Sequence, residues 1–206
     1  MRRKSQRGST MIEFVASTVF WMPLLVGTSV IGLNLIRNIQ VTQLCRDAGH
    51  MYAYGVDFSQ AANQNLLVSK LADGLNITAT GGNGVVIFST ITMIGAAQCT
   101  AAGLAANTTN CPNLNRAVFA RRIVVGNVAK RASRFGTPSP GIIGTGGFIG
   151  STDQCTNTTA RAGNFTSLLA LNPGEFGNLT ETYVGSPDYD WRGYMAGTGV
   201  YASVIF

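Results

Sequence analysis

A single carboxylate, that of Glu13, stands at the beginning of a long apolar run. From Phe14 to Ile36 no residue carries a charge. A carboxylate at membrane depth is costly unless it is paired, so its position favours a functional role. The alternative is that Glu13 extends its carboxylate to the cytoplasmic surface of the membrane and serves no other purpose.

The residues before Glu13 resemble a processing signal. A leader ends in Gly8, Glu13 is the fifth residue after it, and the basic residues of the leader are Arg2, Arg3, Lys4 and Arg7. This spacing resembles the type IV prepilin signal, in which a membrane-embedded prepilin peptidase cuts after the glycine. The resemblance implies that cleavage leaves a new α-amino group on Ser9, which can neutralise the Glu13 carboxylate of a neighbouring subunit.

The residues after Glu13 resemble the TadE-like pseudopilins of tight-adherence (Tad/Flp) pili. Phe14 follows the glutamate, Pro23 lies within the apolar run, and the polar segment 43–49 stands where such helices leave the bilayer. Ser9 stands where type II secretion pseudopilins and type IVa pilins usually have phenylalanine. The resemblance covers about residues 1–60. With 206 residues the chain exceeds the short major pilins of these systems, which usually have tyrosine after the glutamate.

This resemblance implies a minor, non-enzymatic pilus subunit, with Glu13, Phe14 and Pro23 as assembly residues. Its expected partners are the prepilin peptidase, other pilin or pseudopilin subunits, the inner-membrane assembly platform and the membrane itself. Self-assembly into a filament, as a major pilin, is an alternative. So is a pilin-like adhesin that binds a surface or a polyanion. A third alternative, a membrane-anchored periplasmic enzyme, is disfavoured because no nucleophile–base pair is recognisable.

The sequence predicts neither a metal site nor a cofactor site. His50 is the only histidine, and the cysteines form no C-x-x-C pair. Segment 144–150 is similar to a dinucleotide-binding loop, but its third glycine is one position out of place, so we expect an ordinary loop.

The cysteines are four in number, at positions 45, 99, 111 and 155. An even number is typical of disulfide-bonded proteins outside the cytoplasm, and three pairings are possible. Cys99 and Cys111 flank a loop of small and polar residues, so we favour a bridge between them. The roles of Cys45 and Cys155 stay open.

The apolar run has the length of a transmembrane helix. At about 1.5 Å per residue, residues 14–36 span about 35 Å, and a hydrocarbon core is about 30 Å thick. The basic leader predicts a single-pass inner-membrane protein with a cytoplasmic N-terminus and a periplasmic remainder, extracellular if it joins a pilus. A secretory signal peptide has a shorter apolar core. A buried core helix of a soluble protein is the other alternative.

The elements follow from this topology. We expect the leader at 1–8, the transmembrane helix at 9–36, and a periplasmic stalk with a short second helix at 37–74. Apolar spacing predicts that the first helix ends near Tyr54, at Gly55. Asp57 is the expected cap of the second helix, which would end at Gly74 with Phe58, Ala62, Leu66 and Leu71 on one side.

Residues 75–206 are predicted to form a β-rich globular domain. Charged residues make up only 12% of the chain, Gly is frequent, and β-branched runs alternate with turn residues. The predicted strands are 76–80 and 85–94, joined as a hairpin, then 117–125 and 200–206, with long Gly/Thr-rich loops over 137–165. The fold class is therefore α+β, a long helix with an antiparallel sheet of unknown strand order.

The net charge of +6 is concentrated in the leader, and nucleic-acid binding is not expected. No acidic residue lies between Asp73 and Asp153, whereas that interval contains Arg116, Arg121, Arg122, Lys130, Arg131 and Arg134. We expect these residues to form a solvated basic face. Contact with an acidic subunit, polysaccharide or extracellular DNA is the alternative.

Overall fold

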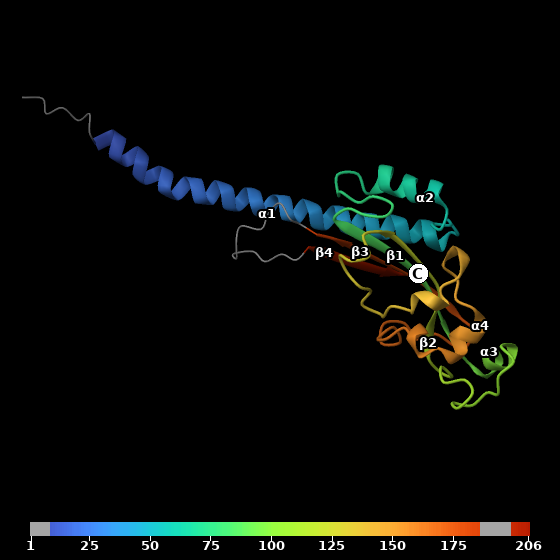
Figure 1. Cartoon of the computed structure of the whole chain (residues 1–206). Helices are drawn as coiled ribbons and strands as arrows, with labels where there is room; N and C mark the ends of the chain where they lie inside the picture. The colour runs from blue at the N-terminus through green and yellow to red at the C-terminus, as the bar shows by residue number, and fades with distance from the viewer. Residues whose placement is uncertain (1–8, 186–198) are drawn as a thin grey trace, which may run out of the picture. The chain divides into compact units, whose positions relative to one another are not determined.

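The computed structural model describes residues 9–185 and 199–206 (Figure 1). The long helix α1, Ser9–Ala53, precedes a four-stranded antiparallel sheet, so the chain is α+β as predicted. The chain divides into two units, residues 1–40 and 41–206, and the boundary lies within α1. The helix ends where expected, because Gly55 has φ +90°, a conformation that glycine adopts readily and other residues rarely.

The sheet has the strand order β2-β1-β3-β4. Its strands are β1 (Gly84–Met93), β2 (Ala117–Gly126), β3 (Phe176–Val184) and β4 (Val200–Ile205). The central strand β1 pairs antiparallel with both β2 and β3. A bulge beside Thr90 and Ile91 shifts the β1–β2 register and leaves Ala120 without a β1 partner. Three of the predicted strands are present, whereas β3 was not expected.

One face of the sheet packs against the C-terminal part of α1. The buried side chains of this core include Val41, Leu44, Ala48 and Tyr52 from the helix and Val86, Phe88, Ile123, Val125 and Val184 from the sheet. The Tyr52 hydroxyl lies 2.8 Å from the Thr90 hydroxyl, which donates to Asn178 Oδ1 at 3.0 Å. This hydrogen-bonded chain joins α1 to the two central strands.

The opposite face of the sheet is covered by the segments between β2 and β3. Its core includes Ile91, Phe119, Phe135, Phe165 and Leu179. Segment 137–165 consists mainly of loops, as expected. It also contains α4 (Ser151–Thr156) and short 3-10 turns at Pro140–Ile142, Thr145–Gly147 and Thr158–Ala160. Helix α3, Ala96–Ala101, lies between β1 and β2 in the chain and packs against α4.

The second helix differs from its prediction. It begins at Ala61 with Gln60 at the cap, runs as α2 (Ala61–Leu66) and continues as a π-helix over Leu67–Leu71. Asp57 does not cap it. Its carboxylate instead accepts a hydrogen bond from Ser59 N at 3.0 Å. The buried side of this helix is also offset from the predicted one, because Ala62 and Leu66 are exposed whereas Leu67 is the buried leucine.

The predicted strand 76–80 is also wrong. Only one isolated bridge, between Ile77 and Gly82, is present. Asn83 N donates to Asn76 O at 2.7 Å, and Asn76 has φ 51°. The glycine-rich segment therefore closes on itself as a tight turn, which leaves too few residues to extend a hairpin.

Candidate functional site

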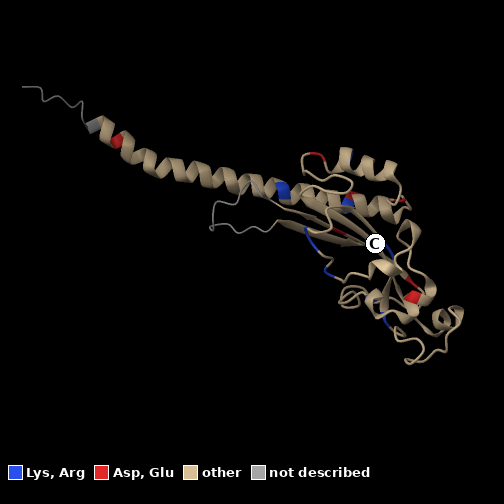
Figure 2. Ribbon diagram, in the orientation of Figure 1, with Lys and Arg blue, Asp and Glu red and all other residues tan. Residues whose placement is uncertain are grey.

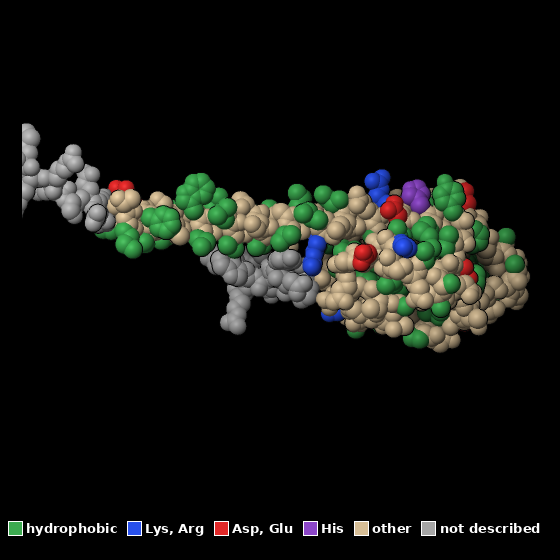
Figure 3. All heavy atoms as spheres, turned by 90° about the horizontal axis from the view of Figure 1, so that it is seen from above, with side chains coloured by type: hydrophobic (Ala, Val, Ile, Leu, Met, Phe, Trp, Pro, Cys, Tyr) green, Lys and Arg blue, Asp and Glu red, His purple; other side chains and the backbone are tan. Residues whose placement is uncertain are grey.

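The described part of the first unit, residues 9–40, is a helix whose apolar side chains are mostly exposed. The exposed fraction is 75% for Met11, 73% for Phe14 and 78% for Phe20. Figure 3 shows hydrophobic side chains along this part of α1. Soluble proteins rarely expose an apolar surface of this extent without a partner. By length and composition α1 can cross a membrane, a property that it shares with signal sequences.

Four hydroxyl groups of this unit are satisfied by the backbone of α1. Four serine and threonine side chains donate to carbonyl oxygens one turn earlier, at 2.8–2.9 Å: Ser17 to Glu13, Thr18 to Phe14, Thr28 to Leu24, and Ser29 to Leu25. Such bonds remove the cost of placing a hydroxyl in an apolar medium. No charged residue lies between Glu13 and Arg37, and the ribbon of α1 in Figure 2 is uncoloured over a long stretch.

The structure locates most of the predicted processing and assembly residues on this helix. Ser9 is the first residue of α1, and Gly8 lies outside the described residues. Glu13 and Phe14 follow in the first turns, and the helix continues through Pro23. Phe14 and Pro23 border the same shallow apolar groove on the helix surface. The nitrogen of Pro23 carries no hydrogen, so it donates no helical hydrogen bond.

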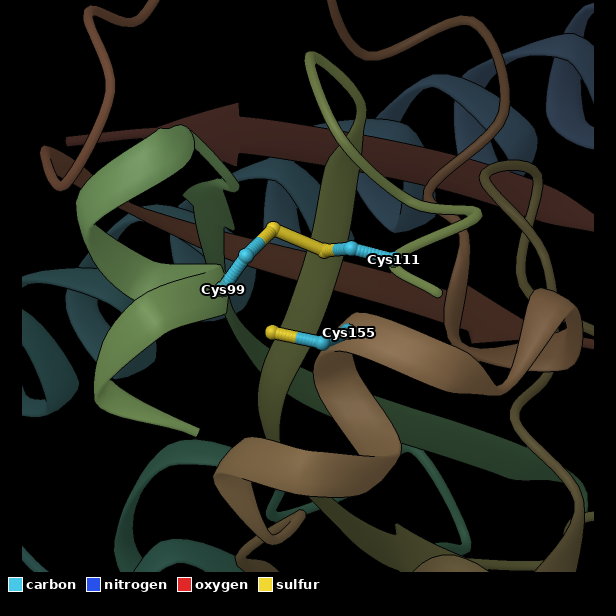
Figure 4. Close-up of side chains that lie close together, drawn as sticks. All are labelled: Cys99, Cys111 and Cys155. Carbon is cyan, nitrogen blue, oxygen red and sulfur yellow. A yellow bond between two sulfur atoms is a disulfide. The ribbon is translucent and has the colours of Figure 1, made fainter. Parts of the chain in front are cut away.

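The predicted disulfide is present. Cys99 and Cys111 are bonded, with their Cα atoms 6.1 Å apart. Cys155 on α4 points toward this bridge (Figure 4), and the three sulfur atoms all lie within 4.8 Å of one another. While the bridge is closed, only Cys155 retains a thiol, so the cluster offers too few thiolates for a tetrahedral metal centre.

Cys45 lies apart from this cluster, on the side of α1 that faces the sheet. Its sulfur donates to Thr180 O at 3.4 Å, and burial raises the pKa of its thiol to about 11. A thiol with this pKa is almost entirely protonated at neutral pH. Cys45 therefore acts as a packing residue in the folded chain.

The predicted solvated basic face is wrong in part. Neighbouring residues of a strand point to opposite sides of the sheet, so Arg121 and Arg122 of β2 separate. Arg121 forms an ion pair with Asp57 and lies 4.2 Å from the ring centre of Phe148. Arg122 is only 7% exposed and donates to Gly136 O at 3.0 Å.

The remaining basic residues of this segment are exposed: Arg116, Lys130, Arg131 and Arg134. Of these, Arg131 lies 4.3 Å from the ring centre of Tyr201, where cation and ring attract each other. Some basic residues of this segment therefore make internal contacts, and the others are exposed.

A buried carboxylate that the sequence did not indicate is that of Glu181 on β3, which is 2% exposed. It accepts hydrogen bonds from Arg134 N at 2.9 Å, from the Tyr201 hydroxyl at 2.7 Å, and from the Ser133 hydroxyl. Burial and the nearby carboxylate raise the pKa of Tyr201. These contacts fasten segment 133–134 to the sheet. A usable signal was that Glu181 shares one side of the strand with the apolar residues Leu179 and Tyr183, two positions away in each direction.

Comparisons with protein-family models, with curated proteins and with solved structures find no match to this chain.

Proposed function

We propose that this chain is a TadE-like minor pseudopilin of a tight-adherence pilus, cut by prepilin peptidase after Gly8. The observation that carries the proposal is the exposed apolar helix α1, which begins at Ser9 directly after the basic leader and has Glu13 in its first turns. In this proposal residues 9–36 anchor the subunit in the inner membrane, and the second unit lies in the periplasm.

The physical role of Glu13 is to select the register of assembly. In the membrane its carboxylate can stay near the cytoplasmic surface at modest cost. When the helix moves into a bundle of similar helices, an unpaired carboxylate becomes far more costly. Pairing with the Ser9 amine of an adjacent subunit offsets that cost only in the correct register. This amine exists only after cleavage, so processing would precede assembly.

The first test is the N-terminus of the mature protein. In a host with an active prepilin peptidase, mass spectrometry of the membrane-extracted chain should find Ser9 at the N-terminus. Gly8→Leu should block cleavage and pilus incorporation together, because a bulky side chain hinders entry of the backbone into the peptidase site. Recovery of the wild-type chain with Met1 intact would refute processing.

The second test separates assembly from processing. Glu13→Ala should leave synthesis, membrane insertion and cleavage largely intact but lower recovery of the chain in sheared pili. Glu13→Gln is the matched control for side-chain size, and it should show the same loss because it also lacks the charge. Normal recovery of both variants in pili would remove the assembly role of Glu13.

Abundance distinguishes a minor from a major subunit. Purified pili should contain this chain as a small fraction of their protein. Filaments composed mainly of this chain would instead identify it as the major pilin.

A further inference from the structure

The cluster of Cys99, Cys111 and Cys155 contains a disulfide and a thiol in direct proximity. Cys99 belongs to α3, Cys111 to the following loop and Cys155 to α4. All three are buried, with exposed fractions of 0%, 0% and 1%. Their sulfur atoms lie within 4.8 Å of one another, whereas a disulfide brings two sulfurs to about 2.0 Å. Either alternative pairing therefore requires Cys155 to approach a sulfur that already lies within 4.8 Å of its own.

Contacts other than the disulfide hold the Cys111 loop against α4. The buried Asn113 donates from its backbone nitrogen to Cys155 O at 3.1 Å. Its side-chain amide donates to Gln154 O and Asn157 O, both at 2.8 Å. Arg161 Nε in turn donates to Asn113 Oδ1 at 2.7 Å. Cys111 and Cys155 therefore stay close whether or not either of them is bonded.

Contacts other than the disulfide also hold Cys99 close to Cys155. Helix α3 packs against α4, and the Cys155 thiol points to Gln98 O at 3.7 Å, one residue before Cys99. The Gln98 side chain accepts a hydrogen bond from Gly95 N at 3.0 Å, which fixes the first turn of α3. The scaffold thus keeps all three sulfurs together without needing a particular bridge.

We infer that Cys155 is an exchange partner of the Cys99–Cys111 disulfide, so that any two of these three cysteines can form the bridge within the folded domain. The inference is independent of the proposed pilus role, because it concerns only the second unit.

The exchange balances without an external oxidant or reductant. Cys155 loses its proton, and its sulfur forms a bond to the sulfur of Cys99 or Cys111 while the Cys99–Cys111 bond breaks. The electron pair of that bond remains on the released sulfur, which takes up the proton. One disulfide and one thiol are present before and after. Burial raises the pKa of Cys155, so its thiolate is scarce, but proximity makes the attack intramolecular.

The test uses full-length chains in which only two thiols remain. In Cys45→Ser/Cys99→Ser, we expect a Cys111–Cys155 bridge, and in Cys45→Ser/Cys111→Ser, a Cys99–Cys155 bridge. Each chain is purified in detergent without reductant, oxidised with glutathione disulfide, which accepts the two electrons and two protons, then quenched in acid, alkylated in denaturant and mapped by mass spectrometry. The expected result is loss of two hydrogens and failure of the two cysteines to alkylate. The matched control is Cys99→Ser/Cys155→Ser, in which Cys45 and Cys111 should both remain alkylatable.

Two results would overturn the inference. One is that both test variants fold, as judged by the same circular dichroism as the wild type, yet keep two alkylatable thiols. The second result comes from the wild-type chain, so it applies even where the variants fail to fold. The wild-type chain is incubated without added thiol, and its thiols are then trapped by alkylation. Bridges that contain Cys155 should accumulate beside the original bridge. Alkylation confined to Cys45 and Cys155 at all times would show that no exchange occurs.

Discussion

Asp57 and Arg121 form the ion pair that joins the segment after α1 to strand β2. The carboxylate accepts hydrogen bonds from Ser59 N and from the Arg121 guanidinium. These donors lower the pKa of Asp57 from its usual 3.8 to about 2. Arg121 also donates from Nε to Gly146 O at 2.8 Å, so the pair orders a second loop. Asp57, which the sequence predicted to cap a helix, therefore makes a tertiary contact instead.

The depressed pKa predicts an acid-dependent contribution to stability. The folded state favours the ionised carboxylate, so its contribution is complete above about pH 4 and is lost as the pH falls toward 2. Asp57→Asn should lower the free energy of unfolding at pH 7 by about 0.5–1 kcal/mol, a modest value because the Asp57 side chain is 39% exposed. Urea unfolding at pH 7 and near pH 2 measures this difference.

The matched control for this variant is Asp73→Asn, since Asp73 is an exposed carboxylate of the same unit. It should change the unfolding curve less than Asp57→Asn does at pH 7, and near pH 2 both variants should have little effect. Equal destabilisation by Asp57→Asn at pH 7 and near pH 2 would contradict the electrostatic explanation.

At the scale of elements, α1 has different surroundings along its length. From Val41 onward it buries Val41, Leu44, Ala48 and Tyr52 at helical spacing against the sheet. Gly49 packs against Val204 of β4 and against Phe206, the residue that follows this strand. A Cβ atom there would lie 2.7 Å from Phe206 Cε2 and 2.8 Å from Val204 Cγ1. The absence of a side chain at this position allows the helix to pack directly on the strand.

Gly49→Val should therefore destabilise the second unit. Overpacking of this kind costs about 1–3 kcal/mol, which corresponds to a fall of roughly 3–10 °C in the melting temperature. Valine is no worse than glycine as a helix former, so a loss would report the packing clash. The control is Gly32→Val, because a Cβ atom at Gly32 meets nothing within 4 Å. Equal melting temperatures of Gly49→Val and the wild type, measured in detergent, would show that β4 yields to the side chain.

The helices and strands that could be predicted from the sequence are those with an uninterrupted run of apolar or β-branched residues. Helix α1, β1, β2 and β4 have long β-branched or apolar runs, and their positions are predicted within a few residues. Strand β3 was hidden because Thr180, Glu181 and Thr182 are buried polar residues at its centre. The Thr180 and Thr182 hydroxyls have no hydrogen-bond partner within the described residues. Gly177, Asn178 and Glu181, which are depleted in strands, interrupt the strand-favouring residues of β3 and obscure its signal.

At the scale of the whole molecule, the buried cores all lie within residues 41–206. The residues described before Val41 contribute none of the buried side chains. The sequence could predict the exposed apolar helix and the Cys99–Cys111 bridge from local patterns. It could not predict the approach of Cys155, because α4 and Asn113 come from distant segments that only the fold brings together.

This division predicts that the second unit folds alone. A fragment of residues 41–206 should be soluble without detergent, because it lacks the exposed apolar surface. Its melting temperature should differ from that of the detergent-solubilised full chain by less than about 3 °C, the shift that roughly 1 kcal/mol produces in a chain of this size. Circular dichroism and size-exclusion chromatography measure both properties. A fragment that is unfolded would mean that residues 9–40 support the core.

The internal hydroxyl bonds of α1 have a mechanical consequence. A helix that donates its serine and threonine hydroxyls to its own carbonyls can rotate about its axis, against lipid or against another helix, without breaking those bonds. Between Phe14 and Ile36 no charge opposes such rotation, so most of the barrier comes from the shapes of the side chains, and the Trp21 and Asn34 side chains add polar contacts. The segment therefore meets little resistance to rotation about its axis over most of its length. Its rotational orientation has to be fixed by charged groups at its ends.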